Sequence, residues 1–237
     1  MASVDVRNVV KVYRRQTEEL RVLDGLTLSI PDGAFVALMG PSGSGKTTLL
    51  NLIGGVDQPT SGDLEVAGTN IARLKGAQLA RWRSASIGYV FQLYNLIPVL
   101  TALENVELPL LLVRMSAGER RKRAETALQL VGLGDRLKHY PRQLSGGQEQ
   151  RVTIARAVVS DPTFLLCDEP TGDLDRKSAD EIMALIEELV GKHSKTVLMV
   201  THDPVVASRA NTTLHLEKGV LVEARRQPQL TTAGGAA

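Results

Sequence analysis

The sequence predicts an α/β fold in which a mostly helical segment interrupts an alternation of strands and helices. An apolar run at 34–39 leads into the glycine-rich stretch G-P-S-G-S-G-K-T, and a helical pattern begins near Gly45. The region at about 93–158 reads as mostly helical, and from residue 164 strands and helices alternate again. Together these three observations indicate an α/β core that carries a helical insert.

Each element is assigned from its apolar pattern and from the turn residues at its ends. Strands are predicted at 3–12 and 22–30, and the second alternates between apolar and polar residues. A turn at 31–33 precedes the buried strand at 34–39, and the helix after it continues through T-T-L-L-N-L-I. The remaining predictions are, in order, short strands at 63–66 and 87–91, a helix at 119–131, a strand at 164–167, an amphipathic helix at 178–190, a buried strand at 196–200 and a hairpin at 212–223.

Composition argues against two classes of function. The 28 lysines and arginines nearly balance the 26 aspartates and glutamates, and aromatic residues make up only 3%. Nucleic-acid binders rely on a positive field or on stacking aromatic rings, so we expect no nucleic-acid partner. No apolar stretch reaches the roughly 20 residues that cross a bilayer, so we expect no direct membrane insertion.

The chain is expected to form one domain over residues 1–224, with a helical subdomain at about 93–158. The tail at 225–237 is rich in small and polar residues and is expected to be disordered. The single cysteine, Cys167, stands in an apolar run and is expected to be a core residue rather than a reactive thiol. One cysteine allows no intrachain disulfide, which fits a reducing compartment.

The glycine-rich stretch matches the phosphate-loop pattern in full, between a strand and a helix. Its glycines let backbone N–H groups converge on the β- and γ-phosphates of a nucleotide at the N-terminus of the helix. Lys46 supplies a mobile cation, and the Thr47 hydroxyl is a candidate ligand of Mg²⁺. The candidate nucleotide-binding residues of this segment are Gly40, Ser42, Gly43, Ser44, Gly45, Lys46, Thr47 and Thr48.

Two adjacent carboxylates follow the apolar strand F-L-L-C. In open α/β sheets the C-terminal end of a strand is where ligands bind. Asp168 is expected to hold Mg²⁺, usually through water, and Glu169 to orient and deprotonate the attacking water. A pair of acids at the start of a helix remains the alternative.

A second glycine-containing helix start occurs in L-S-G-G-Q-E-Q-R-V-T-I-A-R-A, at 144–157. Ser145 is either an ordinary N-cap or part of a second anion cradle, because the first N–H groups of a helix need acceptors. The segment L-S-G-G-Q resembles the signature of the ABC (ATP-binding cassette) ATPase family, and the other family elements stand in the expected order from about Val4 to Glu223. The resemblance implies an α/β fold with a P-loop NTPase core of ABC ATPase type, an N-terminal antiparallel β subdomain and a helical signature subdomain.

The resemblance also implies an ATPase that uses ATP and Mg²⁺ and works as a pair of copies. In this family two nucleotide-binding domains pair head to tail, and each phosphate loop faces the partner's signature. ATP that binds the closed dimer stabilises it by mass action. The residues that would contact the γ-phosphate bound by a second copy of the chain are Ser145, Gly146, Gly147 and Gln148.

Further residues receive roles from the same resemblance. Tyr13 stands where the family has an aromatic that stacks on adenine, and Gln92 where it has a glutamine that senses Mg²⁺ and nucleotide. His202 matches a histidine that positions the γ-phosphate, and Asp175 belongs to a loop, T-G-D-L-D, that crosses the dimer interface. Asp173 departs from the small or amide residue expected in that loop. The alternatives are a plain strand residue for Tyr13, a surface amide for Gln92 and a core histidine for His202.

The catalytic candidates are Lys46, Glu169 and His202, and the metal candidates are Thr47, Gln92 and Asp168.

Several features favour a transporter subunit over other branches of the family. Thr47 and Ser145 are 98 positions apart without heptads, whereas repair and chromosome members insert a long coiled coil. Translation-type members carry two cassettes in one chain. The segment F-Q-L-Y-N-L-I-P-V-L-T-A-L-E-N-V-E-L-P-L-L-L resembles the subgroup of lipoprotein-release, macrolide-export and cell-division ATPases, which pair with four-helix membrane subunits and work by mechanotransmission.

The subgroup implies an integral membrane permease subunit that docks near Gln92–Leu112, with the chain peripheral on the cytoplasmic face of the inner membrane. The complex either exports or extracts a lipoprotein, lipid, peptide or drug, or regulates an envelope enzyme without transport. A free-standing cytosolic ATPase is a third hypothesis. The residues expected to line the groove for a coupling helix of the membrane subunit, with a core role still open for several of them, are Leu93, Leu96, Ile97, Pro98 and Leu100.

Overall fold

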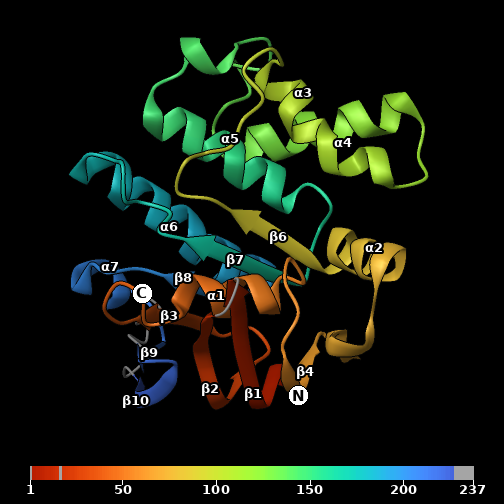
Figure 1. Ribbon diagram of the computed structural model, residues 1–237. Coiled ribbons are helices and arrows are strands. Elements are labelled where there is room, and N and C mark those ends of the chain that lie inside the picture. The colour runs from red at the N-terminus through yellow and green to blue at the C-terminus, as the bar shows by residue number, and fades with distance from the viewer. Residues whose placement is uncertain (1, 16–17, 227–237) are drawn as a thin grey trace, which may run out of the picture.

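The computed structural model describes residues 2–15 and 18–226, and it shows two β-sheets beneath a group of helices (Figure 1). The elements are β1 (Ala2–Arg15), β2 (Glu18–Pro31), β3 (Phe35–Met39), α1 (Lys46–Ile53), β4 (Ser61–Val66), β5 (Thr69–Asn70), η1 (Ile71–Arg73), α2 (Gly76–Ser86), β6 (Ile87–Val90), α3 (Ala102–Glu107), η2 (Leu108–Leu112), α4 (Ala117–Leu130), η3 (Pro141–Gln143), α5 (Gly146–Val158), β7 (Phe164–Asp168), α6 (Arg176–His193), β8 (Thr196–Val200), α7 (Pro204–Ala207), β9 (Thr212–Glu217) and β10 (Val220–Arg226). In Figure 1 the helices α3, α4 and α5 lie together at the top, and β1, β2 and β4 lie at the bottom. The predicted α/β fold class is confirmed.

The N-terminal part forms a four-stranded antiparallel sheet with the order β2-β1-β4-β5. Along β2 the side chains of Leu26, Leu28 and Ile30 are buried, and the polar residues between them are exposed, as expected for a sheet with one covered face. Both long strands extend beyond the predicted ranges. Their outer ends carry charged residues such as Arg14 and Glu19, which pair across the hairpin at 2.8 Å but form no apolar pattern.

The larger sheet has six strands in the order β10-β9-β3-β8-β7-β6, and only β10 runs antiparallel to its neighbour. Its parallel strands are continuous apolar runs because both faces are covered. In β7, Phe164 and Leu166 belong to the core shared with α1 and the antiparallel sheet, whereas Leu165 and Cys167 belong to the core beneath the helices. Cys167 is thus a core residue, as predicted, and burial, with a smaller contribution from the charge of Asp168, raises its pKa to about 12.

Three strands of this sheet end at the same edge, and each is followed by a predicted site segment. The register places Leu38 of β3 and Asp168 of β7 on either side of Val200 of β8. The phosphate loop follows β3, Glu169 follows β7 and His202 follows β8. Parallel pairing therefore gathers residues that are far apart in the sequence.

The three α-helices α3, α4 and α5 of the insert each begin with a capping box, in which the N-cap side chain and the third helical side chain bond each other's backbone N–H. The pairs are Thr101 with Glu104, Ser116 with Glu119, and Ser145 with Gln148. The helix predicted at 119–131 accordingly begins earlier, at Ala117, because Ser116 caps it. These caps fix the starts of α3, α4 and α5 without help from long apolar runs.

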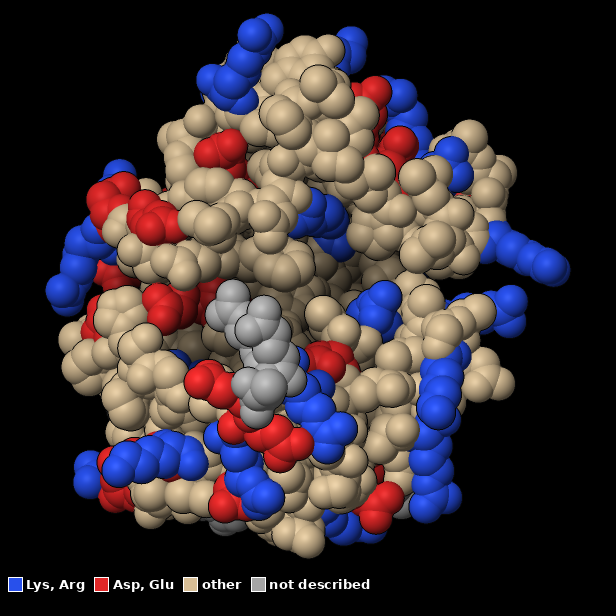
Figure 2. All heavy atoms as spheres, viewed as in Figure 1, with Lys and Arg blue, Asp and Glu red and all other residues tan. Residues whose placement is uncertain are grey.

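The surface and the chain ends complete the comparison with the sequence. Figure 2 shows basic and acidic side chains interspersed over one face, which is hollowed between the helices at the top and the sheets below. Within residues 2–15 and 18–226 no helix is both long and apolar enough to cross a membrane. Strand β10 extends two residues into the tail expected at 225–237, and residues 227–237 lie outside the described part of the chain.

Candidate active site

The phosphate-loop segment at 40–48 connects β3 to α1 at the edge of the large sheet. Gly40 has a φ of 147°, and a Cβ there would collide with the carbonyl oxygen of Leu216 in β9. Gly45, with a φ of 102°, is the N-cap of α1, and a Cβ there would lie 2.9 Å from the side chain of Leu23. Neither position accepts a larger side chain. Glycine at both positions therefore lets the loop follow this path to the helix N-terminus, where its N–H groups can bind an anion.

The loop borders a pocket of about 470 Å³, a volume typical of small-molecule sites. Its lining residues are Leu20, Val22, Gly40, Ser42, Gly43, Gly45, Lys46, Thr47, Thr48, Glu169 and His202. The structure therefore brings most of the predicted loop residues together with both predicted catalytic residues beyond the loop. Leu20 and Val22 of β2 were not selected from the sequence. The available signal was weak, because Leu20 is one apolar residue, 64% exposed, among charged neighbours.

Two side chains of the loop are notable for their hydrogen bonding. Lys46 Nζ donates to the carbonyl oxygens of Gly40 at 2.7 Å and of Pro41 at 2.9 Å, which holds the ammonium group over the loop. Ser44 is 3% exposed, and its hydroxyl has no hydrogen-bond partner within the described residues. A buried polar atom without a partner is unfavourable unless a ligand or water satisfies it. The loop is thus suited to a polar ligand.

The two predicted carboxylates occupy different environments. Burial raises the pKa of Asp168, the negative charge of Glu169 raises it further, and Lys46 partly opposes the rise. Glu169 has a φ of 47°, in the left-handed region that non-glycine residues rarely adopt, and its N–H donates to the carbonyl oxygen of Val200 at 3.0 Å. Its Oε2 lies 3.0 Å from Nδ1 of His202. An ionised carboxylate only accepts, so we assign the proton of the neutral ring to Nδ1, which leaves Nε2 unprotonated.

The candidate metal ligands suit Mg²⁺ by their chemistry. Thr47, Gln92 and Asp168 offer hydroxyl, amide and carboxylate oxygens, which are the hard donors that this ion prefers. Gln92 and Glu169 flank Gly172, because a Cβ there would lie 3.2 Å from Gln92 Nε2 and 3.5 Å from Glu169 Oε2. Within the described residues no group of three or more histidine, cysteine or acidic side chains is placed so that it could hold a metal ion by itself. Mg²⁺ needs no such cluster, since it usually binds one or two carboxylates together with waters and substrate phosphates.

Gln92 lies in the segment at 91–95, which α5 holds at both ends. The fully buried Gln150 donates to the first carbonyl oxygen of the segment at 3.4 Å and to that of Pro170 at 2.7 Å. Arg156 donates to two carbonyl oxygens at the other end of the segment, at 2.6 and 2.8 Å. Sequence reasoning missed both side chains, because their partners are backbone atoms distant in the sequence.

The signature residues lie at the start of α5 and outside the pocket. Ser145 is an N-cap: its hydroxyl oxygen accepts from the Gln148 N–H at 3.3 Å, and its own N–H donates to Gln148 Oε1 at 3.0 Å. A Cβ on Gly147 would lie 3.1 Å from the hydroxyl oxygen of Ser178, so this position is packed against α6. Asp175 caps α6 and accepts from the N–H and the hydroxyl of Ser178, which lowers its pKa. None of these residues lines the pocket.

Tyr94 and Asp173 adjoin the signature. A Cβ on Gly146 would lie 2.9 Å from the Tyr94 hydroxyl oxygen, so a larger residue there would displace the ring. Burial raises the pKa of Tyr94, and the charge of the exposed Asp173 raises it further. Asp173, the departure from the family pattern, therefore adds negative charge close to the start of α5.

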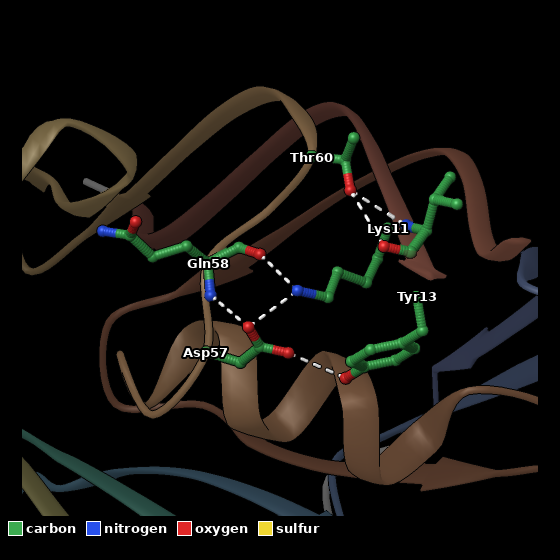
Figure 3. A network of polar contacts seen from close by, with 6 residues as sticks. Lys11, Tyr13, Asp57, Gln58 and Thr60 are labelled. Atoms are coloured by element: carbon green, nitrogen blue, oxygen red, sulfur yellow. Dashed lines mark hydrogen bonds and ion pairs between the residues drawn. The ribbon is translucent and has the colours of Figure 1, made fainter. Parts of the chain in front are cut away.

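Tyr13 lies beside the pocket lining rather than in it. Its hydroxyl donates to Asp57 Oδ2 at 2.7 Å, and Lys11 Nζ lies 4.7 Å from its ring centre (Figure 3). Leu20, its partner across the hairpin, lines the pocket. Burial and the bond to Asp57 raise the pKa of Tyr13, and Thr48, another lining residue, opposes the rise. The ring thus stands at the rim of the pocket.

The segment predicted to receive a membrane subunit is rich in exposed apolar side chains. Of the predicted groove residues, Leu93, Ile97 and Pro98 are exposed, Leu100 is half-buried and Leu96 packs against the helical core. Packing assigns Leu96 to the core, whereas the exposed Leu93, Ile97 and Pro98 remain candidates for the groove. Further exposed apolar side chains of this region are Val99, Leu111, Leu112 and Val113.

A groove larger than this pocket lies elsewhere, between α4 and the C-terminal end of α6. It measures about 650 Å³, and Lys122, Leu130 and Leu189 are among its lining residues. None of the motif residues borders it. Size alone therefore does not select the candidate active site, which we place where the phosphate loop, Glu169 and His202 converge.

Comparisons with known proteins identify the family of the chain. A family model described as ABC transporter matches residues 23–172. An uncharacterised ABC transporter ATP-binding protein of Bacillus subtilis is 49% identical over 217 residues, which cover 92% of this chain and 94% of that protein. A macrolide export ATP-binding/permease protein of Paracoccus denitrificans is 46% identical over 223 residues, which cover 94% of this chain and 33% of its own length.

A solved structure gives the same result for the fold. The ATP-binding cassette of Methanocaldococcus jannaschii, a dimer in a post-hydrolysis state bound to ADP and Pi, matches with a TM-score of 0.87 at 44% identity. The match covers 94% of this chain and 98% of that one. The chain belongs to the ABC transporter family and is an ATPase that uses ATP and Mg²⁺.

Proposed function

We propose that the chain is the ATP-hydrolysing subunit of a membrane transporter complex and that two copies close head to tail around ATP. The observation that carries the proposal is the separation of two anion-binding helix starts. The pocket holds the phosphate loop, Glu169 and His202 but no signature residue, and Ser145 is exposed at the N-terminus of α5. The capping box engages the N–H groups of Ser145 and Gln148, so in a second copy those of Gly146 and Gly147 would meet the triphosphate. The dimeric state of the Methanocaldococcus cassette bound to ADP and Pi supports the pairing of two copies.

In the proposed reaction each side chain has one task. Lys46 exchanges its bonds to loop carbonyls for phosphate oxygens. Glu169 takes a proton from water as the water oxygen bonds to the γ-phosphorus and the bond to ADP breaks. His202, held through Nδ1, uses Nε2 for a γ-phosphate oxygen when that nitrogen is protonated. Thr47, Gln92 and Asp168 would hold Mg²⁺, which would supply positive charge to the phosphates when bound.

A membrane permease subunit docks on the exposed apolar residues of the segment at 93–113. The Paracoccus relative supports such a partner, because it is named as an ATP-binding and permease protein in one chain. Our chain is then peripheral, on the cytoplasmic face of the membrane. Closure of the dimer moves the permease by mechanotransmission, for export or extraction of a lipoprotein, lipid, peptide or drug.

The dimer is tested first with Glu169→Gln, which removes the base and keeps the shape of the side chain. Hydrolysis should fall by about 100- to 10,000-fold, the usual contribution of a general base. Light scattering after size exclusion should show a dimer with ATP and Mg²⁺ and a monomer without ATP. Hydrolysis at the wild-type rate would show that Glu169 is not the base.

The shared site is tested by adding Ser145→Arg to Glu169→Gln. The double variant should bind ATP as a monomer and form no dimer, because the arginine blocks the signature. Ser116→Arg is the matched control, since Ser116 caps α4 with the same capping box and does not line the pocket. It should dimerise normally. An ATP-dependent dimer of the Ser145→Arg variant contradicts the shared site.

A further inference from the structure

A network of hydrogen bonds ties Tyr13 to the segment at 57–60, which follows α1 (Figure 3). Lys11 Nζ donates to Asp57 Oδ1 at 2.7 Å and to the carbonyl oxygen of Gln58 at 2.8 Å. The Gln58 N–H also donates to Asp57 Oδ1, at 2.7 Å. The Tyr13 hydroxyl donates to the other carboxylate oxygen of Asp57 at 2.7 Å. Both oxygens of Asp57 are therefore engaged, one by the cation and one by the ring.

The segment at 57–60, which we call the clamp, is fastened at two further points. The Asp57 N–H donates to the carbonyl oxygen of Asn51 in α1 at 3.2 Å. The Thr60 N–H donates to a carbonyl oxygen of β1 at 2.8 Å, and its hydroxyl oxygen accepts from an N–H of β1 at 2.9 Å. The clamp thus joins the helix that starts with the phosphate loop to the strand that carries Tyr13.

Stability alone is a weak explanation for this network. The side chain of Lys11 is 11% exposed and that of Asp57 is 29% exposed, and the desolvation of such a pair offsets most of its attraction. Burial acts to raise the pKa of Asp57, and the hydrogen bonds from Lys11, Tyr13 and Gln58 lower it overall. Asp57 therefore stays ionised, with both oxygens available as acceptors. The network instead has a geometric effect. It fixes the hydroxyl end of Tyr13, a side chain that is 39% exposed.

We infer that Lys11 and Asp57 are positioning residues that hold the Tyr13 ring as the stacking platform for the adenine base, at a set distance from the phosphate loop. The inference rests on the proposed role of Tyr13 in nucleotide binding. Two neighbours of the ring, Leu20 and Thr48, line the pocket, whereas Lys11 and Asp57 do not. The clamp therefore acts on the base and not on the triphosphate.

The test compares the affinities of ATP and of inorganic tripolyphosphate, which has no base, by calorimetry. Tyr13→Ala should weaken ATP about 5- to 150-fold, the range of one base–aromatic stack. Tyr13→Phe removes the anchoring hydroxyl, and Asp57→Asn weakens the bonds to Tyr13 and Lys11 by removing the charge, so each should weaken ATP by part of this, about 3- to 10-fold. Tripolyphosphate should bind all three variants as it binds the wild type. Asp24→Asn is the matched control, because Asp24 pairs with Arg21 on the surface of the neighbouring strand.

The outcomes separate the inference from the function on which it rests. If Tyr13→Ala weakens ATP but Tyr13→Phe and Asp57→Asn do not, the clamp is not a positioning device, although the platform stands. If Tyr13→Ala leaves ATP affinity unchanged, the platform itself is wrong. If Tyr13→Phe and Asp57→Asn weaken the binding of ATP and of tripolyphosphate equally, the network is structural only. Tyr13→Phe removes a single atom, so it remains informative even if Asp57→Asn folds poorly.

Discussion

Asn105 of α3 anchors the loop at 97–101, within the segment proposed to receive the membrane subunit. It is fully buried, and its Nδ2 lies 3.1 Å from the carbonyl oxygens of Ile97 and Leu100 and 3.0 Å from that of Thr101. Its Oδ1 accepts from the Ile97 N–H at 2.8 Å. We predict that Asn105→Ala and Asn105→Asp release this loop and destabilise the protein.

The expected destabilisation follows from the number of hydrogen bonds that the Asn105 amide can make. The amide has two N–H groups for three carbonyl oxygens, so the side chain makes the equivalent of three hydrogen bonds. At roughly 0.5–1.5 kcal/mol each, their loss destabilises by about 1.5–4.5 kcal/mol. The Ile97 N–H and the Leu100 carbonyl have no second partner within the described residues, which favours the upper part of this range. We expect about 2–4 kcal/mol, or a fall in Tm of about 4–16 °C for a domain of this size.

Differential scanning calorimetry, together with the fluorescence of the single tryptophan, Trp82, measures this change. Asn105→Asp should lower Tm at least as much as Asn105→Ala, because its carboxylate faces three carbonyl oxygens. Thr126→Ala, on the exposed face of α4, is the control and should shift Tm by less than about 2 °C. ATP affinity should not change, since Asn105 does not line the pocket. A fall of less than about 2 °C for Asn105→Asp would refute the reasoning.

Three other variants test packing, the phosphate loop and charge. Gly88→Ala should destabilise the protein by about 1–3 kcal/mol in calorimetry, because the new Cβ would collide with the Ala157 carbonyl oxygen. Gly118→Ala is the control, because the space around Gly118 is open, and it should not destabilise the protein. Equal Tm values for the two variants would contradict this packing. Lys46→Ala should lower ATP affinity in calorimetry at least about tenfold, and unchanged affinity rules out the cradle. The pKa of Asp168 is raised in the folded state, so Asp168→Asn should increase Tm at pH 7. This gain should vanish below about pH 3.8, where both states of the wild type are protonated, and a gain that persists there would contradict the assignment.

Local patterns were sufficient to predict the core of the fold and most of the pocket. The apolar run of β3, the glycines after it and Lys46 are contiguous, and Asp168 ends an apolar strand, so each signal lies within a few residues. Helix α2 was missed because it lacks such a local signal. None of its residues is buried, so it has no apolar stripe for periodicity to detect.

The contacts that complete the site depend on the tertiary fold. Glu169 and His202 are distant in the sequence, and their bond exists because β7 and β8 pair in one register. The grip of Gln150 on two backbone carbonyls and the anchoring of Tyr13 by Asp57 join segments that share no pattern. Side chains of this kind look like ordinary polar residues until their partners are known.

The hairpin of β9 and β10 closes against the phosphate loop, and this has a consequence for how the protein is made. The Gly219 N–H donates to the Ser44 carbonyl oxygen, and Leu216 packs on Gly40. The phosphate loop, the signature segment and Glu169 are therefore synthesised well before the hairpin that packs against the loop. Nascent chains should acquire ATP binding only after the hairpin has been synthesised and has folded against the loop, and until then their unpaired parallel strands are a natural target for chaperones.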